Sequence, residues 1–250
     1  MKTQIKTTQE IEAMRHGGQV LATILQYLKK HTVAGMTTLN VDTLAREQLE
    51  KHGVRAAFLD YDGFPAAICI SVNEEIVHGI PGKRVIREGD LVKYDFGVEH
   101  EGLVTDSAIS FVLGTSTNPK AEKLIKATEE ALSRAIDVVR DGVRVGDISA
   151  VIGQTIQKHG FYVQQTLGGH GVGHRVHEDP WIGNDGVAGT GQTLRAGMTI
   201  ALEPIAAIGT EELMMADDGW TCITTDGSLA AQSEHTILIT ESGAEILTLP

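Results

Sequence analysis

Apolar residues near the amino terminus recur every three to four positions, which is the spacing of one helix face. They are Ile11, Met14, Leu21, Ile24, Leu25 and Leu28. Thr7 followed three residues later by Glu10 matches a capping box, so we predict a helix from there to about Lys30. A second apolar stripe over 41–49 predicts another helix, with Asn40 as its cap and the Lys-His-Gly sequence of 51–53 as its stop.

Strand-like runs rich in Ile, Val and Phe follow at 67–72, 91–98 and 107–113. Two helices are then predicted again, one from Pro119 to about Arg140 and one from Gly146 to a second Lys-His-Gly stop at 158–160. The two stops are 107 residues apart, because 160 − 53 = 107. We interpret the pattern as an internal duplication, with halves at roughly 1–113 and 114–250 of one catalytic domain spanning 1–250. A chance match between two amphipathic helix pairs is the alternative.

The charge balance and the cysteine count narrow the class of protein. There are 21 Lys plus Arg against 33 Asp plus Glu, and the formal net charge of −12 opposes nonspecific binding to a phosphate backbone. Cys69 and Cys222 are too few for a disulfide framework, so we expect a reducing, cytoplasmic location. The first 30 residues lack the apolar core of a signal peptide, and no apolar run reaches the roughly 18 residues of a membrane span. We expect a monomer without nucleic-acid or membrane partners.

The duplication also relates the acidic residues to one another. Asp95 lies within an apolar run, where a carboxylate is costly to bury unless it is paired or bound to a cation. Position 95 plus 107 is 202, next to Glu203, and each half offers a second acid, Asp106 and Glu234. A pseudo-twofold axis would gather four carboxylates around two bridged cations about 3.5 to 4 Å apart. Taken singly, Asp95 could face solvent by strand alternation, Asp106 is typical of a turn or strand start, and Glu234 is typical of a solvated strand edge.

A glycine-rich segment supplies a nitrogen ligand. Residues 168–180 read GGHGVGHRVHEDP, where glycines allow the close backbone approach needed to place His170 on a metal. The alternative is a flexible loop with solvated histidines, and His174 carries no argument beyond a structural role. Pro204 holds the preceding Glu203 in an extended conformation, which aims its carboxylate. Carboxylates with one imidazole suit a pair of divalent cations and predict a two-metal hydrolase.

Together these segments resemble type I methionine aminopeptidase. The resemblance is carried by NEEIVHGIP at 73–81, Asp95 and Asp106 eleven residues apart, GHGVG at 169–173 with HEDP at 177–180, Glu203-Pro204, and AQSEHT at 231–236. It spans nearly the whole chain. It implies an α/β (α+β) fold of the duplicated pita-bread type, with pseudo-twofold symmetry and a central, mainly antiparallel sheet flanked by helices.

The resemblance also implies a role for each site residue. Asp95, Asp106 and Glu234 would bind one divalent ion, and Asp106, His170, Glu203 and Glu234 the other, the metal being Mn, Fe, Co or Zn. Glu203 would take the proton of the attacking water and return it, while His78 and His177 would donate hydrogen bonds near the scissile amide. A purely ligating Glu203 with another general base is the alternative.

The implied methionine pocket and the departures from the family pattern concern specificity. By the resemblance the substrate contacts are His78, Tyr61, Phe64, Cys69, His177 and Trp220, with Phe58 near the rim. Ordinary core packing is the alternative for Cys69 and the favoured interpretation for Phe58. Asp62 replaces a histidine common in the family, and Leu167 and Val176 replace bulkier aromatics, so we predict an atypical tolerance at the first or second substrate position.

The predicted function is metal-dependent removal of the initiator methionine from nascent chains and peptides. An X-Pro dipeptidase or aminopeptidase would share all five ligands, but the His-Gly-Ile-Pro sequence of 78–81 favours the methionine enzyme. A non-catalytic homologue on the same scaffold, which binds peptides, partner proteins or RNA, is the second alternative. The chain retains every metal ligand and is acidic, and both features argue against a non-catalytic protein.

Overall fold

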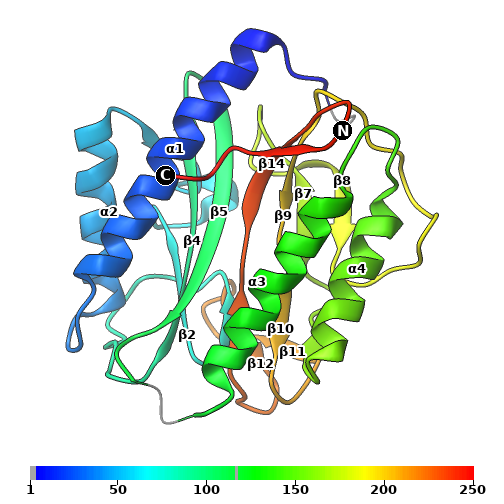
Figure 1. Cartoon of the computed structure of the whole chain (residues 1–250). Helices are drawn as coiled ribbons and strands as arrows, with labels where there is room; N and C mark the ends of the chain where they lie inside the picture. The colour runs from blue at the N-terminus through cyan, green and yellow to red at the C-terminus, as the bar shows by residue number, and fades with distance from the viewer. Residues whose placement is uncertain (1–3, 116–117) are drawn as a thin grey trace.

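The computed structural model describes residues 4–115 and 118–250, and two helices followed by strands occur twice along the chain (Figure 1). The first half contains α1 Thr8–His31, α2 Thr38–His52, β1 Arg55–Ala56, a short 3-10 helix Tyr61–Gly63, β2 Cys69–Val72, β3 Glu75–Val77, β4 Leu91–His100 and β5 Leu103–Val112. The second contains α3 Ala121–Val138, α4 Val145–Lys158, β6 Tyr162–Val163, β7 Gly168–Gly171, β8 Glu178–Gly183, β9 Thr199–Leu202, β10 Ile205–Ala207, β11 Leu213–Met215, β12 Cys222–Thr224, β13 Ala230–Gln232, β14 His235–Ile239 and β15 Ala244–Ile246. In this described part, no helix is long and apolar enough to cross a membrane.

The ends of α1 and α2 follow the predicted capping signals with one exception, and α3 begins at Ala121, two residues after the predicted Pro119. Thr7 and Glu10 form the predicted capping box of α1, and Gly53 ends α2 in the left-handed conformation with φ 68°. The prediction that Asn40 caps α2 is wrong. The cap is Thr37, whose side chain accepts a hydrogen bond from the Asn40 amide while the Asn40 side chain accepts one from the Thr37 amide. Asn40 therefore completes the cap from the third helical position, which the local sequence pattern also allows.

The strands form antiparallel ladders in both halves. In the first half, β4 pairs with β1, β2 and β5. In the second half, the five-stranded sheet has the order β15-β14-β9-β7-β8. The third predicted strand begins earlier than expected, because β5 starts at Leu103 and pairs with β4 over ten residues. Asp106 therefore lies inside a strand and not at a turn or strand start. Glu203 directly follows β9.

The helices cover one face of the sheets, which decides where the acidic side chains point (Figure 1). Tyr94 and Phe96 of β4 pack into the core formed with α1 and α2, and Ile200 and Ile237 pack into the core formed with α3 and α4. Asp95 alternates with its two aromatic neighbours and so points away from the helices. Its exposed fraction is only 7%, so the alternative that Asp95 simply faces solvent is wrong.

The two halves meet where β5 and β14 lie side by side (Figure 1). The Glu234 amide donates to the Ala108 carbonyl at 3.0 Å, and the Asp106 amide donates to the Thr236 hydroxyl at 2.8 Å. The same hydroxyl donates back to the Asp106 carbonyl at 2.8 Å. These contacts place an acid from each half at one seam. The division into halves at 113 and 114 stays a prediction.

Candidate metal centre and active site

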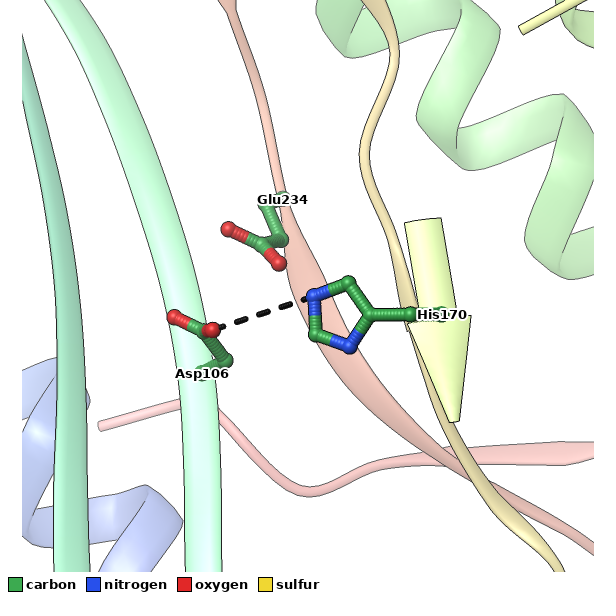
Figure 2. A group of neighbouring side chains, drawn as sticks. All are labelled: Asp106, His170 and Glu234. Carbon is green, nitrogen blue, oxygen red and sulfur yellow. Dashed lines mark ion pairs between the residues drawn. The ribbon is translucent and has the colours of Figure 1, made fainter. Parts of the chain in front are cut away.

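Five side chains converge on the face of the sheets opposite the helices. Asp95 comes from β4, Asp106 from β5 and His170 from β7, while Glu203 follows β9 and Glu234 precedes β14. Their ligand atoms form two groups, Asp106 with His170 and Glu234, and Asp95 with Glu203 and Glu234, each within 4.8 Å. Figure 2 shows the first group, in which His170 Nε2 lies 4.0 Å from Asp106 Oδ2. Glu234 belongs to both groups.

The backbone around His170 explains how the imidazole reaches this position. Strand β7 pairs with β8 through a register shift between His170 and Gly171, and a Cβ at Gly169 or Gly171 would overlap a neighbouring backbone carbonyl. Nδ1 of His170 lies 2.9 Å from the Gly171 carbonyl, which can only accept, so Nδ1 carries the hydrogen. Burial, together with the nearby His177, lowers the pKa of His170 to about 3. The neutral ring therefore presents the Nε2 lone pair to Asp106 and Glu234, as a metal ligand requires.

Without a cation nearby, burial and mutual repulsion make it difficult for the four carboxyl groups to lose their protons. Burial raises the pKa of Asp95 to about 6, and burial plus the charges of the neighbouring acids raise the pKa values of Asp106, Glu203 and Glu234 well above their usual range. Among the described residues, Asp106 Oδ1 and Glu234 Oε2 are buried without a hydrogen-bond partner. Divalent cations would bind these oxygens and offset the repulsion between the carboxylates, so this donor set fits hard metal ions.

One polar residue of the site was missed by the sequence analysis. Nε2 of Gln232 donates to Asp95 Oδ2 at 3.0 Å and to Glu203 Oε1 at 2.7 Å. Gln232 is fully buried on β13. Its only sequence signal is its place two residues before Glu234, inside a segment used for the family resemblance.

Two histidines face the same cavity from different loops. His177 packs edge-on against His170 with ring centroids 4.3 Å apart, and burial lowers its pKa. His78 follows β3 in the left-handed region with φ 59°, and burial lowers its pKa to about 4. Both rings line the cavity that contains the five candidate ligands. As neutral imidazoles each can donate one hydrogen bond to a substrate.

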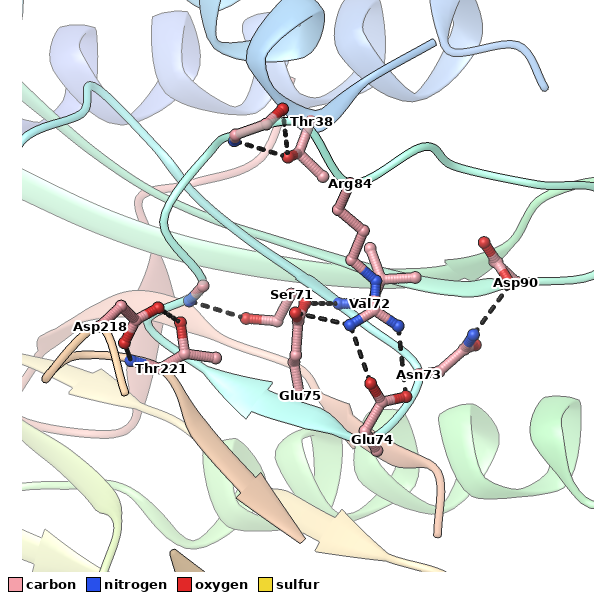
Figure 3. Close-up of polar contacts among 12 residues, drawn as sticks. Thr38, Ser71, Val72, Asn73, Glu74, Glu75, Arg84, Asp90, Asp218 and Thr221 are labelled. Carbon is pink, nitrogen blue, oxygen red and sulfur yellow. Dashed lines mark hydrogen bonds and ion pairs between the residues drawn. The ribbon is translucent and has the colours of Figure 1, made fainter. Parts of the chain in front are cut away.

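Polar contacts fix the chain on either side of His78, and Figure 3 shows those made by Ser71 and Arg84. The Gly79 amide donates to Ser71 Oγ at 3.1 Å, and the Gly79 carbonyl accepts a hydrogen bond from the Ile70 amide at 2.9 Å. Arg84 binds both Glu74 and Glu75 on the far side of the turn, at 2.8 and 2.6 Å. Positive φ at a non-glycine residue is sparsely populated, and these contacts hold His78 in that conformation.

An apolar pocket opens beside the candidate metal ligands. Phe64 and Trp220 meet edge to face with ring centroids 5.3 Å apart, and Cys69 is 4% exposed beneath them. Burial raises the pKa of Cys69 well above its usual range, so its thiol stays neutral. The remaining lining residues are the buried Phe58 and Val176, the half-buried Tyr61 and the exposed Asp62. Phe58 packs in the core, as the sequence analysis favoured, and also lines the pocket wall. Leu167 lines an adjoining cleft with Trp181, His78 and His177.

The amino-terminal segment supports the loop that leads to His177. His174 Nε2 lies 2.7 Å from Glu10 Oε1, and the buried Lys6 ammonium lies 3.1 Å from Glu178 Oε2. Glu178 also accepts the His174 amide at 2.6 Å. His174 is therefore a contact between the loop and α1.

The profile of metallopeptidase family M24 matches residues 12–241, and the chain belongs to that family. Both the fold class and the presence of a metal-using hydrolase site follow from this membership.

Within the family, the chain groups with the methionine aminopeptidases. It is 43% identical to the methionine aminopeptidase of Aquifex aeolicus (strain VF5), with 99% of each chain covered, and 36% identical to that of Escherichia coli (strain K12), with 100% of this chain and 95% of the relative covered. The crystal structure of methionine aminopeptidase from Thermotoga maritima superposes with a TM-score of 0.97 at 44% identity, covering 100% of both chains. The prolidase from Pyrococcus furiosus shares the fold alone, with a TM-score of 0.80 at 23% identity over 98% of this chain and 65% of that one. The predicted pita-bread fold class is confirmed.

Proposed function

We propose that the protein removes the N-terminal methionine from peptides and nascent chains with the help of two divalent cations. The observation that carries the proposal is the pair of ligand groups sharing Glu234 at the base of a pocket walled by Phe64 and Trp220. A shared carboxylate between two ligand groups is what a dinuclear centre needs. The relatives named methionine aminopeptidase support the same activity.

The residues that would hold the cations are Asp95, Asp106, His170, Glu203 and Glu234, of which Glu234 belongs to both ligand groups. When bound, divalent cations lower the pKa of water and polarise a carbonyl group. The family resemblance assigns Glu203 to the same ion as His170, whereas its carboxylate here groups with Asp95 and the Gln232 amide. The resemblance-based assignment stays a prediction. Mn, Fe, Co and Zn all accept this mixed oxygen and nitrogen set, so metal supply would select among them.

The side chains around the cavity would divide the proton transfer and hydrogen bonding. Glu203 would accept a proton from the attacking water and deliver it to the departing amide nitrogen. His177 and His78 would donate hydrogen bonds to the substrate carbonyl oxygen and to the scissile amide region. The methionine side chain would lie between Phe64, Cys69 and Trp220, since a thioether gains from contact with aromatic rings. Tyr61 would contact the substrate near the pocket mouth.

The deciding experiment is metal-dependent peptide hydrolysis with elemental analysis of the active preparation. Metal-free protein is titrated with Mn²⁺ or Fe²⁺ and offered Met-Ala-Ser and Ala-Pro. We expect methionine release that reaches its maximum at two ions per chain, and no cleavage of Ala-Pro. Cleavage of Ala-Pro alone would favour an X-Pro peptidase. Metal binding without release of methionine would favour a non-catalytic peptide-binding protein.

We also propose that the protein acts as a cytoplasmic monomer whose partners are free polypeptide N-termini. The supporting observation is that Cys69 and Cys222 are both buried free thiols, which a reducing compartment preserves. The net charge of −12 supports the absence of specific nucleic-acid binding. Light scattering on the metal-loaded protein should give the mass of a single 26.8 kDa chain.

A further inference from the structure

We infer that Gln232 is a positioning residue that sets the distance between the Asp95 and Glu203 carboxylates before metal binds. Asp95 belongs to the first half and Glu203 to the second, and one amide nitrogen donates to both, at 3.0 and 2.7 Å. An NH₂ group has two hydrogens, so both bonds can form at the same time. Gln232 thus joins two carboxylates that would otherwise repel each other. The inference rests on the proposed metal centre.

Strand β13, which carries Gln232, is itself anchored on both sides. On one side it pairs with β10, where Gln232 lies opposite Ile205, two residues after Glu203. On the other side the Ser110 hydroxyl donates to the Gln232 carbonyl at 2.6 Å and accepts from the Gln232 amide at 3.0 Å. The Gln232 backbone is therefore fixed to β5 of the first half and to β10 of the second.

A buried ammonium group adds a further anchor at the start of β13. Lys93 is 1% exposed, and its Nζ donates to the Ala230 carbonyl at 2.8 Å and to the Asn73 carbonyl at 3.0 Å. Lys93 lies two residues before Asp95 on β4, so one strand of the first half holds both the anchor and the carboxylate. Rigid support of this kind is what keeps a metal ligand in its binding geometry.

Within the described part of the chain, the buried side chain of Gln232 makes its hydrogen bonds only through the amide nitrogen. The side chain is fully buried, and its Oε1 has no hydrogen-bond partner among the described residues. The amide nitrogen therefore binds the two carboxylates while the amide oxygen is left without a partner. An unsatisfied buried acceptor lowers stability, so these two hydrogen bonds are made at an energetic cost. Packing alone would be served as well by an apolar side chain of the same length.

The test compares Gln232→Met with Gln164→Met. Methionine has a similar length and no donor. Gln164 is a matched control, because it is also fully buried and donates to a backbone carbonyl, that of Thr210, at 3.0 Å, away from the metal ligands. Metal-free proteins are titrated calorimetrically with Mn²⁺, and kcat and KM are measured on Met-Ala-Ser.

For Gln232→Met we expect Mn²⁺ binding to weaken by about 10- to 100-fold, the usual effect of removing a partner of a metal ligand. We also expect kcat to fall while KM changes little, because the methionine pocket is untouched. Gln164→Met should bind Mn²⁺ like the wild type. Unchanged Mn²⁺ affinity in Gln232→Met, or an equal loss in both variants, would overturn the inference.

A second variant covers the case in which Gln232→Met does not fold. Gln232→Asn keeps the amide but withdraws it by one methylene group, so it cannot reach both carboxylates. The expected loss of Mn²⁺ affinity is again at least about 10-fold, and wild-type affinity would overturn the inference. Failure of the wild-type protein to bind Mn²⁺ or to release methionine would instead reject the proposed function, which separates the two outcomes.

Discussion

The phenolic hydroxyl of Tyr61 lies 3.0 Å from Nδ1 of His177, and the two rings meet edge to face. Burial, with the nearby Asp62, raises the pKa of Tyr61, so the phenol keeps its proton and can donate it to Nδ1. The remaining hydrogen of the neutral imidazole is then on Nε2, which is the state needed to donate to a substrate. We therefore predict that Tyr61 selects the tautomer of His177.

Replacing Tyr61 with Phe tests this relationship. The variant keeps the ring but loses one hydrogen bond of about 1 kcal/mol, so we expect kcat on Met-Ala-Ser to fall about five-fold. KM should change little, because the apolar pocket wall is retained. Tyr162→Phe is the control, since Tyr162 lies exposed on β6. A kcat equal to that of the wild type would show that His177 does not depend on the phenol.

Asp62 is predicted to bias the choice of the second substrate residue. Its exposed carboxylate lies at the pocket mouth beside His177, at the position where the family often has histidine. Repulsion of an acidic second residue should be worth about 1 kcal/mol at most for exposed charges. The wild type should therefore prefer Met-Lys-Ser over Met-Glu-Ser by up to about five-fold in kcat/KM. Asp62→Asn should narrow that ratio, and so should high salt.

The matched control for this experiment is Asp60→Asn. Asp60 and Asp62 are both exposed and both have positive φ, 64° and 49°, a conformation that Asn tolerates. Asp60 does not belong to the lining of the pocket. Equal ratios for the wild type and Asp62→Asn would remove Asp62 from the specificity argument.

Local patterns were sufficient to predict much of the fold. The Thr7 and Glu10 capping box and the glycine stop at Gly53 are contacts between residues close in sequence, so their signals are complete within a short window. The alternation of Asp95 with Tyr94 and Phe96 placed the acid on the face opposite its aromatic neighbours. Whether that face is buried depends on residues in the other half of the chain, and the pattern of one strand gives no information about them.

The features that sequence analysis missed depend on contacts across the seam between the halves. Asp106 was predicted as a metal ligand, but its place inside β5 and its contact with Thr236, 130 residues away, were not predicted. Gln232 gave no signal, because its function depends on reaching Asp95 and Glu203, which are 137 and 29 residues away. Lys93 gave no signal either, because its buried ammonium group binds the main-chain carbonyls of Asn73 and Ala230, 20 and 137 residues away.

Glu203→Gln separates proton transfer from metal binding. The amide is nearly isosteric and retains one oxygen for a ligand, but it cannot accept and return a proton. We expect kcat to fall by about 10²- to 10⁴-fold, the usual contribution of a general acid and base. Metal content by elemental analysis should stay close to that of the wild type. Parallel loss of metal and activity would instead assign Glu203 a purely ligating role.

Removal of metal should lower both activity and stability. In the metal-free protein the buried carboxyl groups of Asp106 and Glu234 retain unpaired oxygens, and bound cations favour the folded state by mass action. Treatment with EDTA should therefore abolish methionine release and lower Tm, and added Mn²⁺ should restore both. A Tm that does not respond to EDTA or Mn²⁺, measured by differential scanning calorimetry, would contradict a metal centre at these residues.

The link between α1 and the His177 loop should weaken in acid. Hydrogen bonds from the Thr7 amide and from His174 lower the pKa of Glu10 from 4.5 to about 2. A lowered folded-state pKa means that the ionised group stabilises the fold fully above about pH 4.5, and that this contribution declines as the pH falls toward about 2. The Tm difference between the wild type and Glu10→Gln should therefore be present in full at about pH 5 and shrink clearly by pH 3. Glu122→Gln, in the first turn of α3, is the control for charge at a helix start. A Tm difference for Glu10→Gln that stays constant down to pH 3 would show that Glu10 is not held ionised by these contacts.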